Sequence, residues 1–298
     1  MSSSDLHPAA TTAAAAAPDV PGQPAPPRRA TVWQRITAVD TGVQLARVGV
    51  LVAALALWTL AVERGWVLRL YAATPRQTWD QLVHLLGTGS FWSNLALTLQ
   101  ETLAGWVIGS ALGLVTGLIL GRWQRGAKVM DPYLTFMNAT PKIALAPFFI
   151  LWFGIGANSK IVLAAMIVFF IVQVPTQAAV ALVLPDLELV VTTMGATELQ
   201  KFRKVVLPGI MPAVFGALRL GAVYALLAVV LGEFIAAQRG LGQSLITATN
   251  QFNMATAFAL LIVLAVLAVG INSLIGLVER RLLRWRTWEA SAAVGSPL

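Results

Sequence analysis

The feature that most constrains this chain is a series of long apolar runs between residues 42 and 278. A helix needs about 20 mostly apolar residues to cross a bilayer, and several of the runs are long enough. Only 11% of the residues are charged, against about 25% in average globular proteins, so a water-soluble fold would lack a polar coat. The chain is therefore predicted to be an all-α, polytopic helical membrane protein.

About six spans are predicted, and in chain order they are Gly42–Val62, Leu103–Leu120, Thr135–Gly154, Ile161–Val183, Pro212–Phe234 and Ala255–Val278. The third contains Pro141 and Pro147, so we expect a kink or a partly unwound segment there. Between the first two spans, Thr74, Pro75 and Gln77 predict a helix start with a capping box. The apolar residues that follow recur at helical spacing, which is typical of an amphipathic helix on the outer surface.

The two ends of the chain are predicted to lie outside the membrane domain of residues 41–286. Residues 1–40 are rich in Ala, Pro and Ser, and such a tail is expected to be disordered because it buries little apolar surface. Residues 287–298 form a C-terminal tail. The net charge of +8 fits basic cytoplasmic flanks better than nucleic-acid binding.

The basic residues also predict the orientation of the chain. With both ends inside, most Lys and Arg residues fall on the inner side, in the two terminal flanks, in 121–131 and in 185–210. The outer side then carries only Arg64, Arg69, Arg76, Lys160 and Arg239. Because basic residues concentrate on the cytoplasmic side of membrane proteins, both termini are predicted to be cytoplasmic.

Five glycines recur every four residues in the second span: Gly105, Gly109, Gly113, Gly117 and Gly121. Four-residue spacing places them on one helical face. A face without side chains lets a second helix approach closely in lipid, where van der Waals packing holds helices together. The pattern predicts tight helix packing and gives no information on function.

Several kinds of catalysis are excluded by the residues present. There is no cysteine and there are only two histidines, His7 and His84, neither inside a predicted span. The H-E-x-x-H zinc pattern and the Gly-Lys pair of a phosphate-binding loop are both absent. We therefore expect no enzyme activity, no metal site and no bound cofactor in this chain, and any ATP must be bound by another chain.

The polar stretch at about 186–208 carries the pattern that indicates a family. Gly195 is followed by nine residues and then by Val205-Val206-Leu207-Pro208. This spacing resembles the cytoplasmic loop of binding-protein-dependent ABC importer permeases, written E-A-A, three residues, G, nine residues, I-x-L-P. Similarity to the nitrate/sulfonate/taurine branch rests on residues 140–147, 152–156, 232–234 and 240–242. The E-A-A positions hold Leu189-Val190-Val191 here, with Glu188 beside them.

The resemblance implies an ATPase-coupling loop made of Glu188, Leu189, Gly195, Ala196, Glu198, Lys201, Phe202, Leu207 and Pro208. Two short helices joined at Gly195 would project as an elbow, since glycine permits an unusual backbone turn. Pro208 is expected to stop the second helix before the fifth span. The charged residues of the second helix would form a polar face for a soluble partner.

The resemblance also implies the surroundings of the chain. They comprise a bacterial inner membrane, two ABC ATPase subunits that bind ATP and Mg, an extracytoplasmic solute-binding protein and a second permease copy. The solute would be a sulfonate, nitrate, taurine or a similar organic anion. An ion-gradient-driven secondary transporter remains an alternative, although no internal repeat is visible. A membrane protein with a purely structural role is a third possibility.

Ionisable residues inside a bilayer are costly and therefore candidates for function. Lys142, Arg219 and Glu233 are such residues, and Asn138 and Gln173 are polar residues that could line a translocation path. Each has a structural alternative. Lys142 could reach the inner interface, Arg219 could bind a structural partner near the inner surface, and Glu233 could be a surface residue at a helix end.

Overall fold

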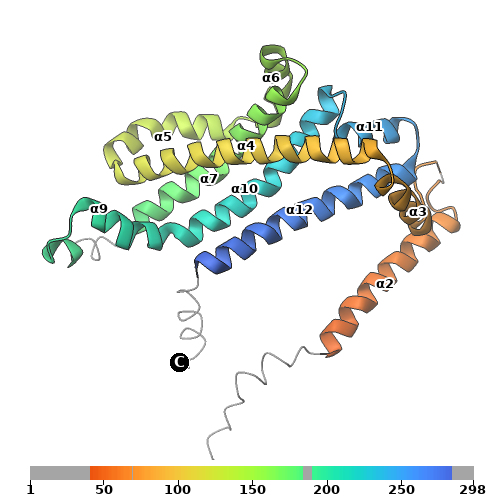
Figure 1. Ribbon diagram of the computed structural model, residues 1–298, viewed down its shortest axis with the longest axis horizontal. Helices are drawn as coiled ribbons and strands as arrows, with labels where there is room; N and C mark the ends of the chain where they lie inside the picture. Colours follow the sequence, from red (N-terminus) through yellow and green to blue (C-terminus); the bar gives the residue numbers. More distant parts are fainter. Residues whose placement is uncertain (1–40, 69, 184–189, 284–298) are drawn as a thin grey trace, which may run out of the picture. The chain divides into compact units, whose positions relative to one another are not determined.

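The computed structural model describes residues 41–68, 70–183 and 190–283, and all regular elements within these ranges are helices (Figure 1). The chain divides into two units, Met1–Ala54 and Leu55–Leu298. The first contributes only the start of helix α2 (Thr41–Glu63) to the described part. The predicted tails 1–40 and 287–298, together with Arg69, Glu188 and Leu189, lie outside the described residues.

Five helices of the described part are long and apolar enough to cross a membrane. They are α2, α4 (Gly89–Arg122), α7 (Ala157–Leu182), α10 (Leu207–Ala236, continuous with residues from 198) and α12 (Met254–Leu282). A bent helix pair makes a sixth span if it is counted as one. The fold is therefore the predicted all-α membrane bundle.

The predicted third span is broken. Helix α5 (Gln124–Ala139) is followed by a 3-10 turn η1 (Lys142–Leu145) and α6 (Ala146–Phe153), and the two halves meet at 79°. The break lies at Pro141, which has extended backbone angles. Pro147 lies in the first turn of α6, where the missing N–H costs nothing because first-turn amides have no helical partner. The expected interruption is thus confirmed, at one of the two prolines.

The predicted amphipathic helix between the first two spans starts where the sequence predicts. Helix α3 (Pro75–Leu86) has Thr74 as its N-cap, and Thr74 Oγ1 accepts from the Gln77 amide at 3.3 Å. In return Gln77 Oε1 accepts from the Thr74 amide at 2.9 Å, which completes the capping box. Trp79 on its apolar stripe is 65% exposed.

The core lies where α4, α7 and α10 pack together, with α4 and α7 side by side (Figure 1). The glycine face of α4 meets α7 along its length. A Cβ on Gly105 would lie 2.6 Å from the Cβ of Ala164, and one on Gly117 would lie 2.8 Å from the Cβ of Thr176. Such distances are shorter than real carbon contacts, so only glycine permits this helix separation.

The expected helix stop at Pro208 is wrong. Helix α9 (Glu198–Lys201) continues through a π-helical turn η2 (Phe202–Val206) directly into α10. A proline inside an α-helix loses one hydrogen bond and its ring clashes with the preceding turn. The wider π-helical turn just before Pro208 changes the hydrogen-bond register there, so the chain stays helical.

Candidate functional site

The turn at Gly195 gives the predicted coupling loop a defined shape. Residues 190–193 are helical, and Gly195 follows with a φ of 78°. Its amide donates to the Thr192 carbonyl at 2.9 Å, and the Ala196 amide donates to the Val191 carbonyl at 3.2 Å. This pair of bonds is a Schellman motif, which ends a helix with a left-handed residue. A Cβ on Gly195 would meet nothing within 4 Å, so φ alone favours glycine here.

A second cap starts the next helix immediately. Thr197 Oγ1 accepts from the Gln200 amide at 3.4 Å, and Gln200 Oε1 accepts from the Thr197 amide at 2.9 Å. The C-terminal cap of one helix and the N-terminal capping box of the next are thus only two residues apart. We call residues 190–206 the elbow, a helix–turn–helix that both caps hold in a fixed bend.

Charged and apolar contacts attach the elbow to the membrane helices. Glu198 binds Arg122, the last residue of α4, at 3.3 Å and Lys201 at 2.5 Å. Phe202 packs on the buried cluster of Val180, Val206, Ile210 and Val214, which joins α7 to α10. Leu207 and Pro208 are half-buried on the same helix. A force applied to the elbow would therefore reach α4, α7 and α10 together.

The outward side of the elbow offers apolar groups to a partner. Met194 is 79% exposed and Leu199 is 66% exposed, one on each side of the Gly195 turn. Ala196 is half-buried beside them. Arg203 and Lys204 are exposed on the following turn. This mixture of apolar and basic side chains suits a soluble protein surface.

Lys142 lies at the break between α5 and η1. Its ammonium donates to the Asn138 carbonyl at 2.7 Å and to Asn138 Oδ1 at 3.0 Å, and it lies 4.7 Å from the centre of the Phe170 ring. A cation at a helix C-terminus satisfies carbonyls that lack helical partners. Lys142 therefore caps α5 and fixes the orientation of the Asn138 amide.

Arg219 has the structural partner that one interpretation expected. Its guanidinium binds Glu279 of α12, and it lies over Gly276 of the same helix, 2.9 Å from the position of a Cβ. The side chain of Arg219 is 40% exposed and that of Glu279 is 24% exposed. The pair joins α10 to α12.

Glu233 is not a surface residue, which corrects one of the alternatives offered for it. It is 0% exposed, and it accepts from Thr98 Oγ1 at 2.7 Å and from the Gly242 amide at 2.6 Å. Thr98 Oγ1 in turn accepts from the Leu241 amide at 2.9 Å. The carboxylate thus occupies the N-terminus of α11 (Leu241–Asn250), where free amides favour negative charge. A Cβ on Gly240 would collide with this carboxylate, which explains the glycine.

A buried ion pair lies nearby and was missed from the sequence. Lys160 Nζ binds Glu101 Oε1 at 2.6 Å, with exposed fractions of 5% and 1% for the two side chains. Lys160, which the predicted topology places on the outer side, lies in the first turn of α7. One signal could have indicated the position of Glu101, although it does not identify Lys160 as the partner. Glu101 precedes Gly105 by four residues, so it lies on the glycine face that meets α7.

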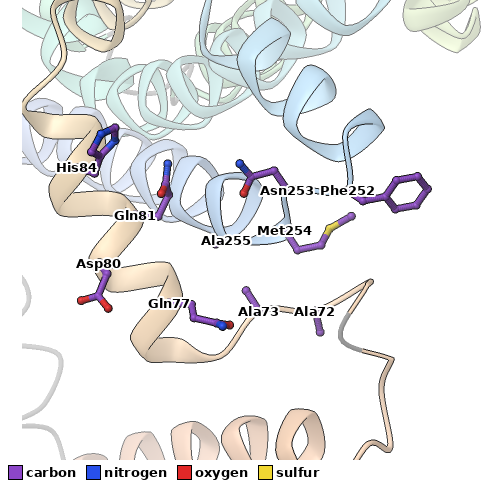
Figure 2. Close-up of a pocket in the computed structure, with 10 residues that line it drawn as sticks. All are labelled: Ala72, Ala73, Gln77, Asp80, Gln81, His84, Phe252, Asn253, Met254 and Ala255. Carbon is purple, nitrogen blue, oxygen red and sulfur yellow. The ribbon is translucent and has the colours of Figure 1, made fainter.

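An open cavity of about 480 Å³ lies between α3 and the α11–α12 corner (Figure 2). Gln81 of α3 and Asn253 of the α11–α12 corner line it from two different elements. Asn253 Oδ1 accepts from the Thr256 amide at 3.2 Å, which caps α12. Phe252 beside it has a φ of 55°, a backbone conformation that is costly for a bulky residue.

Comparisons with known proteins agree with this arrangement. A family model described as "Binding-protein-dependent transport system inner membrane component" matches residues 109–284. The putative aliphatic sulfonates transport permease of Bacillus subtilis is 30% identical over 78% of this chain and 84% of that protein. The riboflavin transport system permease of Chloroflexus aurantiacus is 30% identical over 78% of this chain and 86% of that protein. The taurine transport system permease of Escherichia coli is 27% identical over 80% of this chain and 88% of that protein.

A solved structure shows the same fold. A chain of the inward-facing MetNI methionine ABC transporter matches with a TM-score of 0.52 and 23% identity, over 71% of this chain and 98% of that one. The family model alone covers more than half of the chain. This chain therefore belongs to the inner membrane components of binding-protein-dependent ABC importers, as a permease subunit whose ATPase is a separate chain.

Proposed function

We propose that this permease works as a homodimer that receives a small organic anion from an extracytoplasmic binding protein and is driven by two ATPase subunits. Both termini would lie in the cytoplasm, and ATP and Mg would bind only to the ATPases. One bundle of five or six spans is small for enclosing a gated path, which favours a second copy. The expected mass of the intact complex, measured natively, is that of two permeases and two ATPases.

The elbow is the observation that best supports coupling of this permease to the ATPases. Its two caps make a rigid projection, and Phe202 and Glu198 attach it to three membrane helices. We assign ATPase docking to this surface, with the exposed Met194 and Leu199 as its apolar contacts. Closure of the ATPases would then move α7 and α10, which precede and follow the elbow in sequence.

The solute class is proposed from the relatives and from the site. Two of the similar proteins are named for aliphatic sulfonates and for taurine, while another is named for riboflavin. We favour a sulfonate-type anion. The test uses the reconstituted permease, its ATPase and its binding protein, and measures uptake of taurine, ethanesulfonate, nitrate and riboflavin. Uptake of riboflavin alone would overturn this choice of solute.

Substitution of Gly195 tests the coupling role. Gly195→Val places a β-branched residue at a φ of 78°, which should break the turn, reduce uptake by about tenfold and weaken co-purification of the ATPase. Gly195→Asn should retain most activity because asparagine tolerates this conformation. Gly216→Val is a matched control on α10, since a Cβ there meets nothing within 4 Å. Wild-type uptake and ATPase binding in Gly195→Val would show that the elbow does not couple the two subunits.

A further inference from the structure

A cavity of about 330 Å³ lies between α5 and α7, and its lining includes Asn138 and Gln173, two of the candidate path residues. Asp131, Leu134, Thr135 and Asn138 line it from α5, and they recur at the i, i+3, i+4, i+7 spacing of one helical face. Gln173 and Gln177 line it from α7. We call these residues the amide cavity. Its volume is near the lower limit for small-molecule sites.

Gln173 gives the amide cavity an unsatisfied acceptor. Its side chain is 1% exposed, and its Nε2 donates to Gln177 Oε1 at 2.5 Å. Its Oε1 is buried and has no hydrogen-bond partner among the described residues. An unpaired buried polar atom is costly, and a bound ligand that donates to it removes the cost.

The glycine face of α4 holds Gln173 in this position. A Cβ on Gly113 would lie 3.1 Å from the backbone nitrogen of Gln173, and one on Gly117 would lie 2.9 Å from the backbone carbonyl oxygen of Gln173. The backbone of Gln173 is therefore pressed against two glycines and cannot shift toward α4. The packing of α7 against the glycine face of α4 thus holds the side-chain amide of Gln173 in the lining of the amide cavity.

The remaining groups of the amide cavity are mainly donors. Lys142 occupies Asn138 Oδ1, so the NH₂ group of Asn138 is the free half of that amide. Gln177 Oε1 is occupied by Gln173, which leaves the NH₂ group of Gln177. Thr135 adds a hydroxyl. Neutral donors can hold an oxyanion without the strong ion pair that would slow its release.

We infer that the amide cavity is a solute subsite within the permease. It takes a small molecule that carries an oxyanion at one end and a hydrogen-bond donor, such as an ammonium group, at the other. The oxyanion binds the amides of Asn138 and Gln177 and the hydroxyl of Thr135. The donor group binds Gln173 Oε1. The ligand class rests on the proposed function, whereas the cavity itself does not.

The absence of cysteine from the chain permits a direct test. Ala178, which lines the amide cavity, is replaced by cysteine in the full permease–ATPase complex and labelled with N-ethylmaleimide. Taurine at millimolar concentration should slow labelling by about tenfold, and ethanesulfonate, which lacks the ammonium, should slow it less. Gln238→Cys, exposed in the α10–α11 connection, is the control whose labelling taurine should not change.

Adding Gln173→Leu to Ala178→Cys should abolish protection by taurine, while Gln100→Leu on the exposed face of α4 should leave it intact. Failure of taurine to protect Ala178→Cys, or protection that survives Gln173→Leu, would overturn the subsite. This outcome is distinct from failure of the proposed function, because labelling requires neither the binding protein nor ATP hydrolysis. If the complex takes up sulfonates but taurine does not protect Ala178→Cys from labelling, the subsite proposal is rejected and the proposed transport function stands.

Discussion

At the residue scale, the buried charges of this permease are matched individually. Lys160 neutralises Glu101 between α7 and α4, and the N-terminus of α11 receives Glu233. Charged groups deep in a membrane protein are tolerated only when they are paired or bonded to the backbone. The short sequence 240–242 has glycine at two positions because the Glu233 carboxylate occupies the space of their side chains.

Breaking the Lys160–Glu101 pair should destabilise the protein strongly. Lys160→Met leaves a buried carboxylate without a partner, and the expected loss in the free energy of unfolding is about 3–5 kcal/mol. Adding Glu101→Leu should restore most of that loss because no unpaired charge then remains. Thermal unfolding of the detergent-solubilised protein measures both changes.

The matched control is Lys128→Met, which removes an exposed lysine after α4 and should change the unfolding midpoint little. If the Lys160→Met and Lys128→Met proteins unfold at the same temperature, the buried pair does not stabilise the fold. A double variant no more stable than Lys160→Met would show that the packing of the lysine stem matters more than its charge.

At the element scale, the glycine face determines how α4 and α7 pack. The Cβ of a residue at Gly109 would lie 2.8 Å from the Cβ of Val168, and nearer still to the carbonyl oxygen of Ala165. Backbone atoms cannot rotate away as a flexible side chain can. The next glycines of the same face, Gly113 and Gly117, contact the backbone of Gln173. The helix packing and the position of Gln173 in the amide cavity therefore both depend on the glycine face of α4.

Gly109→Val should therefore force α4 and α7 apart and lower the free energy of unfolding by about 3 kcal/mol. Ala111→Val is the control, because Ala111 is exposed on the opposite side of α4 and a larger side chain meets no helix there. Unfolding midpoints in detergent compare the two proteins. A Gly109→Val protein as stable as the Ala111→Val protein would contradict the close helix approach.

At the scale of the whole molecule, the broken helix pair of α5 and α6 decides the topology. Counted as one span, it gives six crossings and places both termini on the same side of the membrane. Counted as a re-entrant loop, it gives five and places them on opposite sides. The concentration of basic residues on one side favours six.

Single cysteines in the cysteine-free chain test this choice. With six crossings, a membrane-impermeant thiol reagent should label Ser3→Cys and Ser296→Cys only after the cells are permeabilised. Gln238→Cys, in the α10–α11 connection, should be labelled in intact cells and serves as the positive control. Labelling of one terminal cysteine in intact cells would mean that α5 and α6 do not cross the membrane together.

The sequence determined the features that depend on short stretches of chain. Apolar runs long enough to cross a bilayer require helices, because no water is available there to satisfy the backbone. The capping box at Thr74, the interruption near Pro141 and the turn at Gly195 follow from the conformational limits of single residues. The spacing of five glycines likewise fixed which face of α4 meets another helix.

Only the tertiary structure decided which distant groups meet. Glu101 and Lys160 are 59 positions apart, Thr98 and Glu233 are 135 apart, and no local pattern relates the members of either pair. Pro208 shows the same limit, since a π-helical turn outside the usual helical period keeps the chain helical where proline predicts a stop. Polar groups inside a membrane find their partners across helices, so their roles depend on packing that periodicity does not contain.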